Sequence, residues 1–200
     1  MKLLSLLALS TLAASPAFAQ ETRQLDSHEH GVGQLDIAFD GSLVAMELHA
    51  PGADIVGFEY GAESDEDIAK VEDALLVLAQ PLGLFVVPKA AQCSVVAVRA
   101  ELESEDEHKD HEEEGHDDHG DEEHEGEDHD DHAEDVGHTE FHAEYLLECG
   151  DITALTEISF TYFTAFPDAV EVEVQVISDQ GATAFEVEHD APMLDLTSLN

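Results

Sequence analysis

Histidines and acidic side chains crowd together between Glu103 and Asp135. This stretch of 33 residues holds 20 acidic residues and seven histidines. Neutral imidazole is the commonest side-chain ligand for metals such as zinc, and carboxylates can complete a tetrahedral coordination shell. An acidic run that only keeps the chain solvated would explain the charge but not the histidines. The pattern therefore predicts metal binding, with these ligands: His108, His111, His116, His119, His124, His129 and His132.

The same stretch has no means of forming a packed core. It contains no Val, Ile, Leu, Phe, Tyr or Met, so it cannot bury enough apolar surface to offset the entropy cost of ordering its backbone. We expect residues 103–137 to be a disordered loop inserted between two strands. The residue types leave the metal open among zinc, nickel and copper, because copper binds most tightly to almost any such site.

Residues 1–19 have the features of a secretory signal peptide. Lys2 precedes an apolar run, and a cleavage motif of small residues occupies positions 17–19. The run is shorter than the roughly 20 apolar residues of a membrane span, and no later segment approaches that length, so we expect no membrane insertion. Residues 20–200 should form a single metal-binding domain that resides in the periplasm.

The formal net charge of −42 narrows the range of partners. Only six Lys and Arg residues are present, too few for the clustered contacts that nucleic-acid phosphates require. A strong field of one sign instead concentrates divalent cations. The sequence has no His-Glu-x-x-His motif and no nucleophile elbow, so we do not expect an enzyme.

Alternating apolar residues predict an α+β fold with a mostly antiparallel sheet, one main helix and about seven strands. Asp40-Gly41 separates two alternating runs and predicts a hairpin. Ser64 can cap a helix that continues towards Pro81. Further strands are expected at residues 92–102, 140–148, 170–176 and 182–187, with β structure also in 153–165.

Cys93 and Cys149 flank the acidic stretch. Two cysteines in an oxidising compartment are expected to form a disulfide. If they face each other in an antiparallel strand pair, the acidic loop becomes the turn that joins the two strands. This register gives the pairs Val95–Leu147, Ala97–Tyr145 and Leu102–Glu140.

Several short motifs together resemble the ZrgA-like periplasmic zinc-binding proteins. The motifs are His28-x-His30-Gly31, Gly57-Phe58-Glu59, Cys93, the His-rich acidic insert, Phe141-His142 with Tyr145 and Cys149, and Phe166-Pro167. The resemblance covers nearly the whole mature chain. It implies a protein that captures zinc and assists an ABC-type zinc importer through its periplasmic component, without itself transporting or hydrolysing anything. One departure is Tyr60, where such proteins are expected to have a histidine after Gly-Phe-Glu.

Spacing and resemblance together favour a folded metal site near the start of the mature chain. On an extended strand, His28 and His30 point to the same side about 6–7 Å apart. That spacing suits one zinc ion, with Glu59 as a third ligand.

Two more candidate ligands, His138 and His142, lie on the far side of the acidic stretch. Four residues of strand span about 13 Å, so an extended segment keeps these two imidazoles from sharing an ion. We expect His138 at the mouth of the loop, and His142 either beside a ligand from another strand or simply at the surface. His49 and His189 have the pattern of ordinary strand-end residues.

Two other functions remain open beside zinc capture. The protein could be a structural or interaction protein to which metal binding is incidental, or it could store or detoxify divalent metals such as nickel and copper. Unchanged behaviour of a variant without the loop histidines, under zinc limitation, would favour the first of these.

Overall fold

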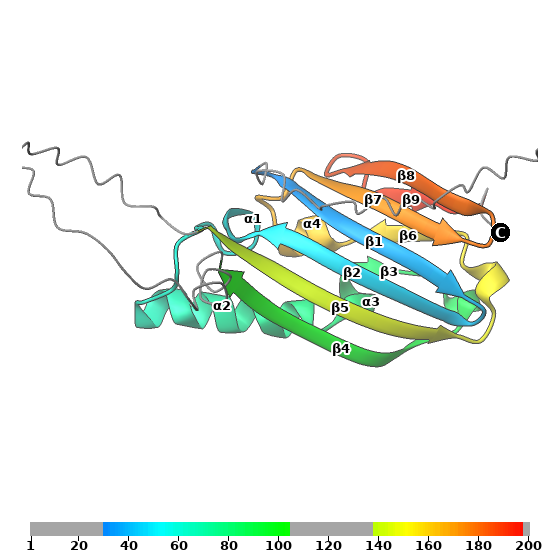
Figure 1. Cartoon of the computed structure of the whole chain (residues 1–200), viewed down its shortest axis with the longest axis horizontal. Helices are drawn as coiled ribbons and strands as arrows, with labels where there is room; N and C mark the ends of the chain where they lie inside the picture. The colour runs from blue at the N-terminus through cyan, green and yellow to red at the C-terminus, as the bar shows by residue number, and fades with distance from the viewer. Residues whose placement is uncertain (1–29, 105–137, 198–200) are drawn as a thin grey trace, which may run out of the picture.

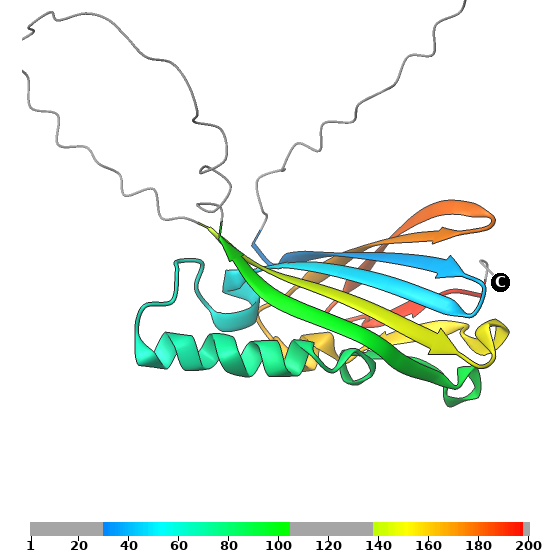
Figure 2. The same cartoon turned by 60° about the horizontal axis from the view of Figure 1, so that its bottom comes forward.

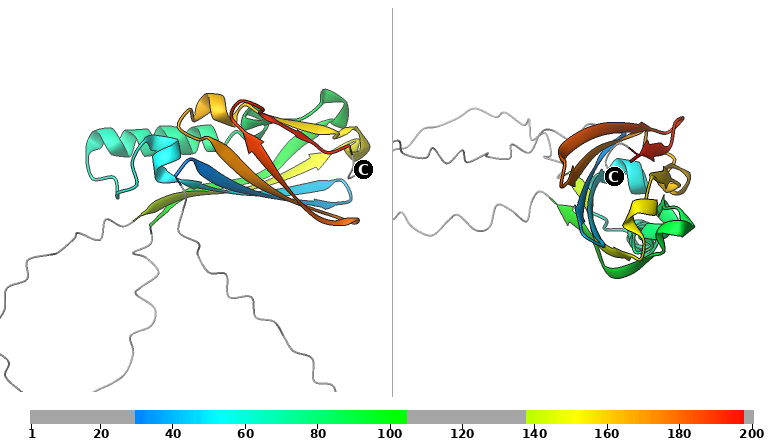
Figure 3. Two further views of the ribbon diagram at one scale, coloured as in Figure 1. Left: turned by 90° about the horizontal axis from the view of Figure 1, so that it is seen from above. Right: turned by 90° about the vertical axis from the view of Figure 1, so that its right-hand side faces the viewer.

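The computed structural model describes residues 30–104 and 138–197. The predicted signal peptide, His28 and the seven histidines of the acidic stretch lie outside these residues. Within them, a six-stranded sheet packs against short helices, one longer helix and a three-stranded sheet (Figure 1). The helices and the small sheet all cover the same face of the large sheet (Figures 2 and 3). The predicted α+β class is confirmed.

Nine strands are present in the described parts of the chain: β1 (Val32–Asp40), β2 (Leu43–Pro51), β3 (Phe85–Val86), β4 (Cys93–Ser104), β5 (Thr139–Cys149), β6 (Glu157–Phe160), β7 (Glu171–Ser178), β8 (Gly181–Glu188) and β9 (Met193–Asp195). The helices are α1 (Gly52–Val56), α2 (Asp65–Leu78), α3 (Pro81–Leu84) and α4 (Tyr162–Ala165), with 3-10 turns at Lys89–Ala91 and Ile152–Ala154. None of these helices is long and apolar enough to cross a membrane.

The large sheet has the strand order β4-β5-β2-β1-β7-β8, and the small sheet has the order β3-β6-β9. Neighbouring strands are antiparallel except β1 and β7, which are parallel. The hairpin of β1 and β2 is confirmed, and Gly41 has a φ of 60° in its turn, a conformation in which a side chain would be strained. Because successive side chains alternate between faces, β1, β2, β5 and β7 each bury apolar side chains on one face of the sheet.

The predicted helix is confirmed as α2, and its N-cap works as expected. The Ser64 hydroxyl accepts a hydrogen bond from the backbone N–H of Asp67 at 3.1 Å. Ala74 and Leu78 are buried, whereas Ile68 in the first half of the helix is exposed. Figures 1 and 2 show why: the start of α2 extends past the end of the large sheet, which leaves that part of the helix uncovered.

The expectation of β structure across residues 153–165 is only partly correct. Strand β6 occupies four of these residues, and most of the others belong to a 3-10 turn and helix α4. Aromatic packing accounts for the difference, because Tyr162 and Phe163 insert their rings into the core beside Phe85 and Phe166. Tertiary packing of this kind overrides the local β-branched pattern.

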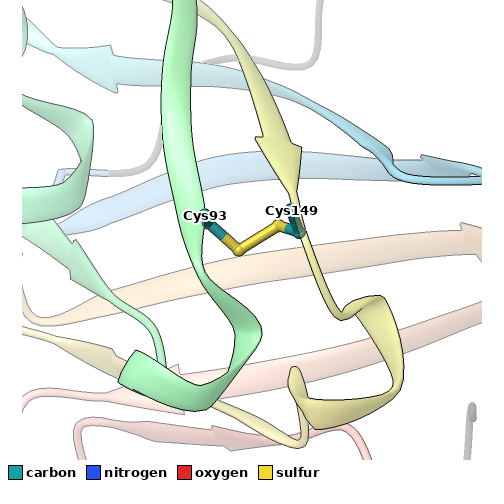
Figure 4. Close-up of a disulfide and its surroundings, with 2 residues drawn as sticks. All are labelled: Cys93 and Cys149. Carbon is teal, nitrogen blue, oxygen red and sulfur yellow. A yellow bond between two sulfur atoms is a disulfide. The ribbon is translucent and has the colours of Figure 1, made fainter.

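The predicted disulfide is present between Cys93 and Cys149, the first pair of the β4–β5 ladder (Figure 4). The pair Val95–Leu147 is also confirmed, but the rest of the predicted register is wrong by one residue. A β-bulge between Val95 and Ala97 shifts the pairing, so Val98 faces Tyr145 and Leu102 faces Phe141.

The bulge decides which side chains of β4 face the core. It turns Val98, Ala100 and Leu102 towards the core, where they pack against buried residues. It therefore turns Glu101 and Glu103 to the other face of the sheet. Strand β4 also continues to Ser104, two residues into the stretch that we predicted as loop.

Candidate metal centre

The uncovered face of the large sheet brings two histidines together. His49 on β2 lies directly opposite His142 on β5, and Glu101 on β4 lies opposite His142 on its other side. The two imidazole rings stack with their centroids 4.4 Å apart and their planes 21° apart. Three neighbouring strands thus place these side chains in one row across the sheet.

Glu47 lies at the point where the two imidazoles converge. Its Oε1 atom is 3.2 Å from His49 Nε2 and 3.2 Å from His142 Nε2. One ligand atom from each of the three residues lies within 4.8 Å of the others, which is close enough to surround one metal ion. The exposed fraction is 27% for the His49 side chain, 13% for His142 and 41% for Glu47. The group is therefore partly buried but accessible to solvent.

Further carboxylates face the other nitrogen of each ring. His49 Nδ1 is 3.3 Å from Glu140 Oε2 on β5. His142 Nδ1 is 3.5 Å from Glu103 Oε1 and 3.9 Å from Glu101 Oε1, both on β4. Glu101, Glu103 and His142 form a second group that could hold a metal ion, and it shares His142 with the first group.

These contacts shift the protonation of the group. The hydrogen bond to Glu140 raises the pKa of His49 above its ordinary value of 6.5, with Glu47 acting in the same direction against the opposing effect of burial. The hydrogen bond from His49 lowers the pKa of Glu47. The contacts therefore favour the protonated form of His49 and the ionised form of Glu47.

A second cluster lies at the end of the sheet where β5 begins. Glu59 Oε1 is 3.4 Å from His30 Nδ1, and Glu59 Oε2 is 2.9 Å from His138 Nδ1. The Glu59 side chain is 15% exposed, whereas the imidazoles are largely exposed. One carboxylate thus bridges two histidines that are far apart in the sequence.

Buried Asp54 holds the turn that carries His30. Its Oδ1 atom accepts a hydrogen bond of 2.8 Å from the backbone N–H of Gly31, and the side chain is 3% exposed. Burial raises the pKa of this carboxyl group. His30 itself lies in the turn before β1. Because His28 lies outside the described residues, the spacing of His28 and His30 stays a prediction.

Tyr60, the departure from the expected Gly-Phe-Glu-His motif, is turned towards α2. Its hydroxyl lies 3.4 Å from Asp67 Oδ2, and its ring stacks on Phe58 with the centroids 4.7 Å apart. A phenol does not supply the neutral imidazole nitrogen that a histidine would offer at this position. The imidazole that contacts Glu59 from the start of β5 is that of His138, with His138 Nδ1 2.9 Å from Glu59 Oε2.

The structure thus divides the predicted folded-site residues between two clusters. It brings together His30, Glu59 and His138, and it places His142 beside ligands from β2 and β4. His49 is not an ordinary strand-end residue, because it faces His142. His189, by contrast, packs its ring against Phe163 at 5.5 Å.

Sequence reasoning missed the roles of His49, Glu47, Glu103 and Glu140. A signal was present: Glu47 and His49 are two apart on one strand, and Glu140 and His142 are two apart on another, so each pair shares a face. The missing information was that β2 and β5 are neighbours, which no local pattern reveals.

The sequence as a whole also matches a known family. The family model of the ZrgA family zinc uptake proteins matches residues 27–196. The chain therefore belongs to the ZrgA family of zinc uptake proteins, as the motifs in its sequence suggested. No curated protein matches the chain.

Proposed function

We propose that this protein is a periplasmic zinc-binding protein that captures zinc and assists a high-affinity zinc importer. Membership of a zinc uptake family supports the zinc-related role. The observation that carries the proposal is the convergence of His49 and His142 on Glu47, an arrangement of two imidazoles and one carboxylate that suits zinc. The signal-peptide pattern of residues 1–19 supports the periplasmic location.

The seven histidines between residues 108 and 132 would supply a second grade of site. Their sequence favours many interchangeable sets of ligands over one fixed set. Each set must be ordered when an ion binds, so these sites should be weaker than one formed on the sheet. We infer that this segment collects zinc and buffers it, while the folded domain binds an ion more tightly.

The cluster of His30, Glu59 and His138 lies where β5 begins, next to the end of the acidic segment in the sequence. We infer that it binds zinc together with His28. The sequence predicted His28, His30 and Glu59 as the ligands of this site, and His138 lies beside Glu59 as a further candidate. The long-range negative field of the protein would raise the local concentration of zinc at both clusters.

We propose no catalytic activity for this protein. Glu47, His49 and His142 have an arrangement that suits the holding of an ion, and the family description concerns uptake. Delivery to the periplasmic component of an ABC importer would make the ion itself the cargo. Turnover of a substrate that disappears with a chelator would contradict this part of the proposal.

The proposal is tested by zinc-limited growth of a host strain in which the native gene is replaced by variants. Combined His49→Ala and His142→Ala substitutions should lower zinc accumulation, and replacement of the seven loop histidines by Gln should lower it further. A variant with Glu173→Gln, on strand β7 away from both clusters, is the control and should behave as wild type. Equal zinc accumulation by all strains, including one without the gene, would contradict a role in zinc uptake.

A further inference from the structure

His49 and His142 share an unusual feature: each imidazole has carboxylate oxygens at both of its nitrogens. The Nε2 atoms both face Glu47 Oε1 at 3.2 Å. The Nδ1 atoms face different carboxylates, with Glu140 at 3.3 Å from His49 and Glu103 at 3.5 Å from His142. Only one nitrogen of a neutral imidazole carries a proton, so the two sides of each ring cannot be equivalent.

We propose that Glu140 and Glu103 are positioning residues for a divalent-metal site formed by Glu47, His49 and His142. This inference rests on the proposed function and specifies where and how the folded domain holds zinc. Glu140 accepts the Nδ1–H of His49 at 3.3 Å, and Glu103 is the carboxylate nearest to Nδ1 of His142, at 3.5 Å. A proton held at Nδ1 on the side of these carboxylates leaves the Nε2 lone pair for the metal. Partners of this kind on the second nitrogen are typical of metal-binding histidines.

The distances at Glu47 fit a cation between the three groups. When both imidazoles are neutral and protonated at Nδ1, each Nε2 atom offers its lone pair on the side of Glu47, where a positive ion can accept it. Without an ion, a protonated imidazole can donate its Nε2–H to Glu47 at the same separation. Two ligand atoms of a tetrahedral zinc ion, at bond lengths near 2.0–2.1 Å, are about 3.3 Å apart. The observed Nε2–Oε1 separations of 3.2 Å are close to this value.

The alternative position beside Glu101 and Glu103 is less suited to zinc. It offers one imidazole rather than two, and the distances from His142 Nδ1 to the carboxylates are 3.5 and 3.9 Å. Glu101 is also engaged by Arg99, whose Nη2 atom lies 2.8 Å from Glu101 Oε2. A neutral His142 cannot ligate through both nitrogens, so the two positions exclude each other.

The site at Glu47 would provide three protein ligands and leave the fourth tetrahedral position open. A fourth ligand from solvent or from another protein can enter there, because the group is on the uncovered face of the sheet. An ion held in this way is accessible to an incoming ligand, as delivery to an importer requires.

The test is zinc binding by the full mature chain, measured by competition with a chelator of known zinc affinity. Glu140→Gln and Glu103→Gln should each weaken the tightest site about 10- to 100-fold, the range typical for loss of a carboxylate partner on a ligating histidine. Glu144→Gln is the matched control, because this substitution removes the same charge from a nearby position. Glu144 lies opposite Glu47 in the sheet, but it belongs to neither of the two groups that could hold a metal ion. Its affinity should stay close to wild type.

A second readout separates positioning from general weakening. The ¹⁵N chemical shifts of His49 and His142 in the zinc-bound protein should show protonated Nδ1 and zinc-bound Nε2, and the glutamine variants should shift this tautomer balance. Equal affinities of all three variants, or zinc bound through Nδ1 of His142, would overturn the inference.

A wild-type chain that binds no zinc would instead overturn the proposed function. Tight zinc binding that survives the combined His49→Ala and His142→Ala change would overturn the inference alone.

Discussion

The disulfide between Cys93 and Cys149 joins the first residue of β4 to the last residue of β5, which are 56 positions apart in the sequence (Figure 4). The β4–β5 ladder extends from this disulfide to the pair Ser104–Thr139 at its other end. The covalent link thus holds one end of the strand pair that is interrupted by the acidic segment.

Replacing both cysteines by serine should lower the free energy of unfolding by about 2–4 kcal/mol, because the unfolded chain regains the freedom of a long closed loop. Denaturant unfolding of the variant beside the oxidised and reduced wild type checks this value. The reduced wild type should resemble the variant, and equal stability of all three samples would contradict the expected role. Zinc binding at Glu47, His49 and His142 should persist in the folded variant, because none of the three residues is paired with Cys93 or Cys149.

The local elements could be predicted because each has a complete sequence signal. Asp40-Gly41 defined the β1–β2 hairpin, and Ser64 marked the start of α2. The bulge in β4 also had a sequence signal that we did not use. The apolar residues alternate in one phase up to Val95 and in the other phase from Val98, so a strand without a bulge would turn Glu101 and Glu103 towards the core.

The candidate site was harder to predict because it depends on pairings between distant segments. The His49–His142 contact needs β2 beside β5, and the contact of Glu59 with His138 joins residues 79 positions apart. Residue types identified metal-binding chemistry, but only the sheet order shows which ligands share an ion. The small sheet β3-β6-β9 was missed for the same reason.

Gly52 should be essential to the end of the sheet near His138. A Cβ atom at this position would lie 2.4 Å from Thr139 Oγ1 and 2.7 Å from the Phe58 carbonyl oxygen, so the backbone would have to move. We expect Gly52→Ala to cost about 1–3 kcal/mol of stability, as other overpacking substitutions do. Gly61→Ala is the control, since nothing lies within 4 Å of its Cβ and its φ is not positive. Thermal unfolding of the two variants should differ clearly, and equal melting temperatures would contradict the close packing.

The raised pKa of His49 predicts how zinc binding depends on pH. Glu140 stabilises the protonated imidazole, so a proton competes with zinc up to a pH above the ordinary histidine value of 6.5. Affinity at the Glu47 site should therefore fall as the pH falls through the raised pKa of His49, and binding should fail below about pH 6. Chelator competition across this range should show a midpoint at lower pH in Glu140→Gln, because that change removes the main cause of the shift. An unmoved midpoint would contradict the assigned partner.

The same shift predicts the stability of the metal-free protein. A folded-state pKa above the unfolded value stabilises the fold fully below pH 6.5, and this contribution is lost as the pH rises through the raised value. Relative to His49→Asn, the wild type should lose stability as the pH rises over this window. Denaturant unfolding in the presence of a chelator measures the difference, and parallel pH profiles of the two proteins would refute the prediction.

Zinc titration by calorimetry at neutral pH tests the central claim most directly. The mature protein is compared with a variant in which all seven loop histidines are changed to Gln, and with the same variant carrying His49→Ala and His142→Ala. The account predicts that the weaker sites of the loop disappear in the first variant, while the tight site at His49 and His142 and the site at His30, Glu59 and His138 remain. The tight site should then disappear in the second variant. Loss of all zinc binding in the first variant would show that the sheet face does not hold zinc and would contradict the account.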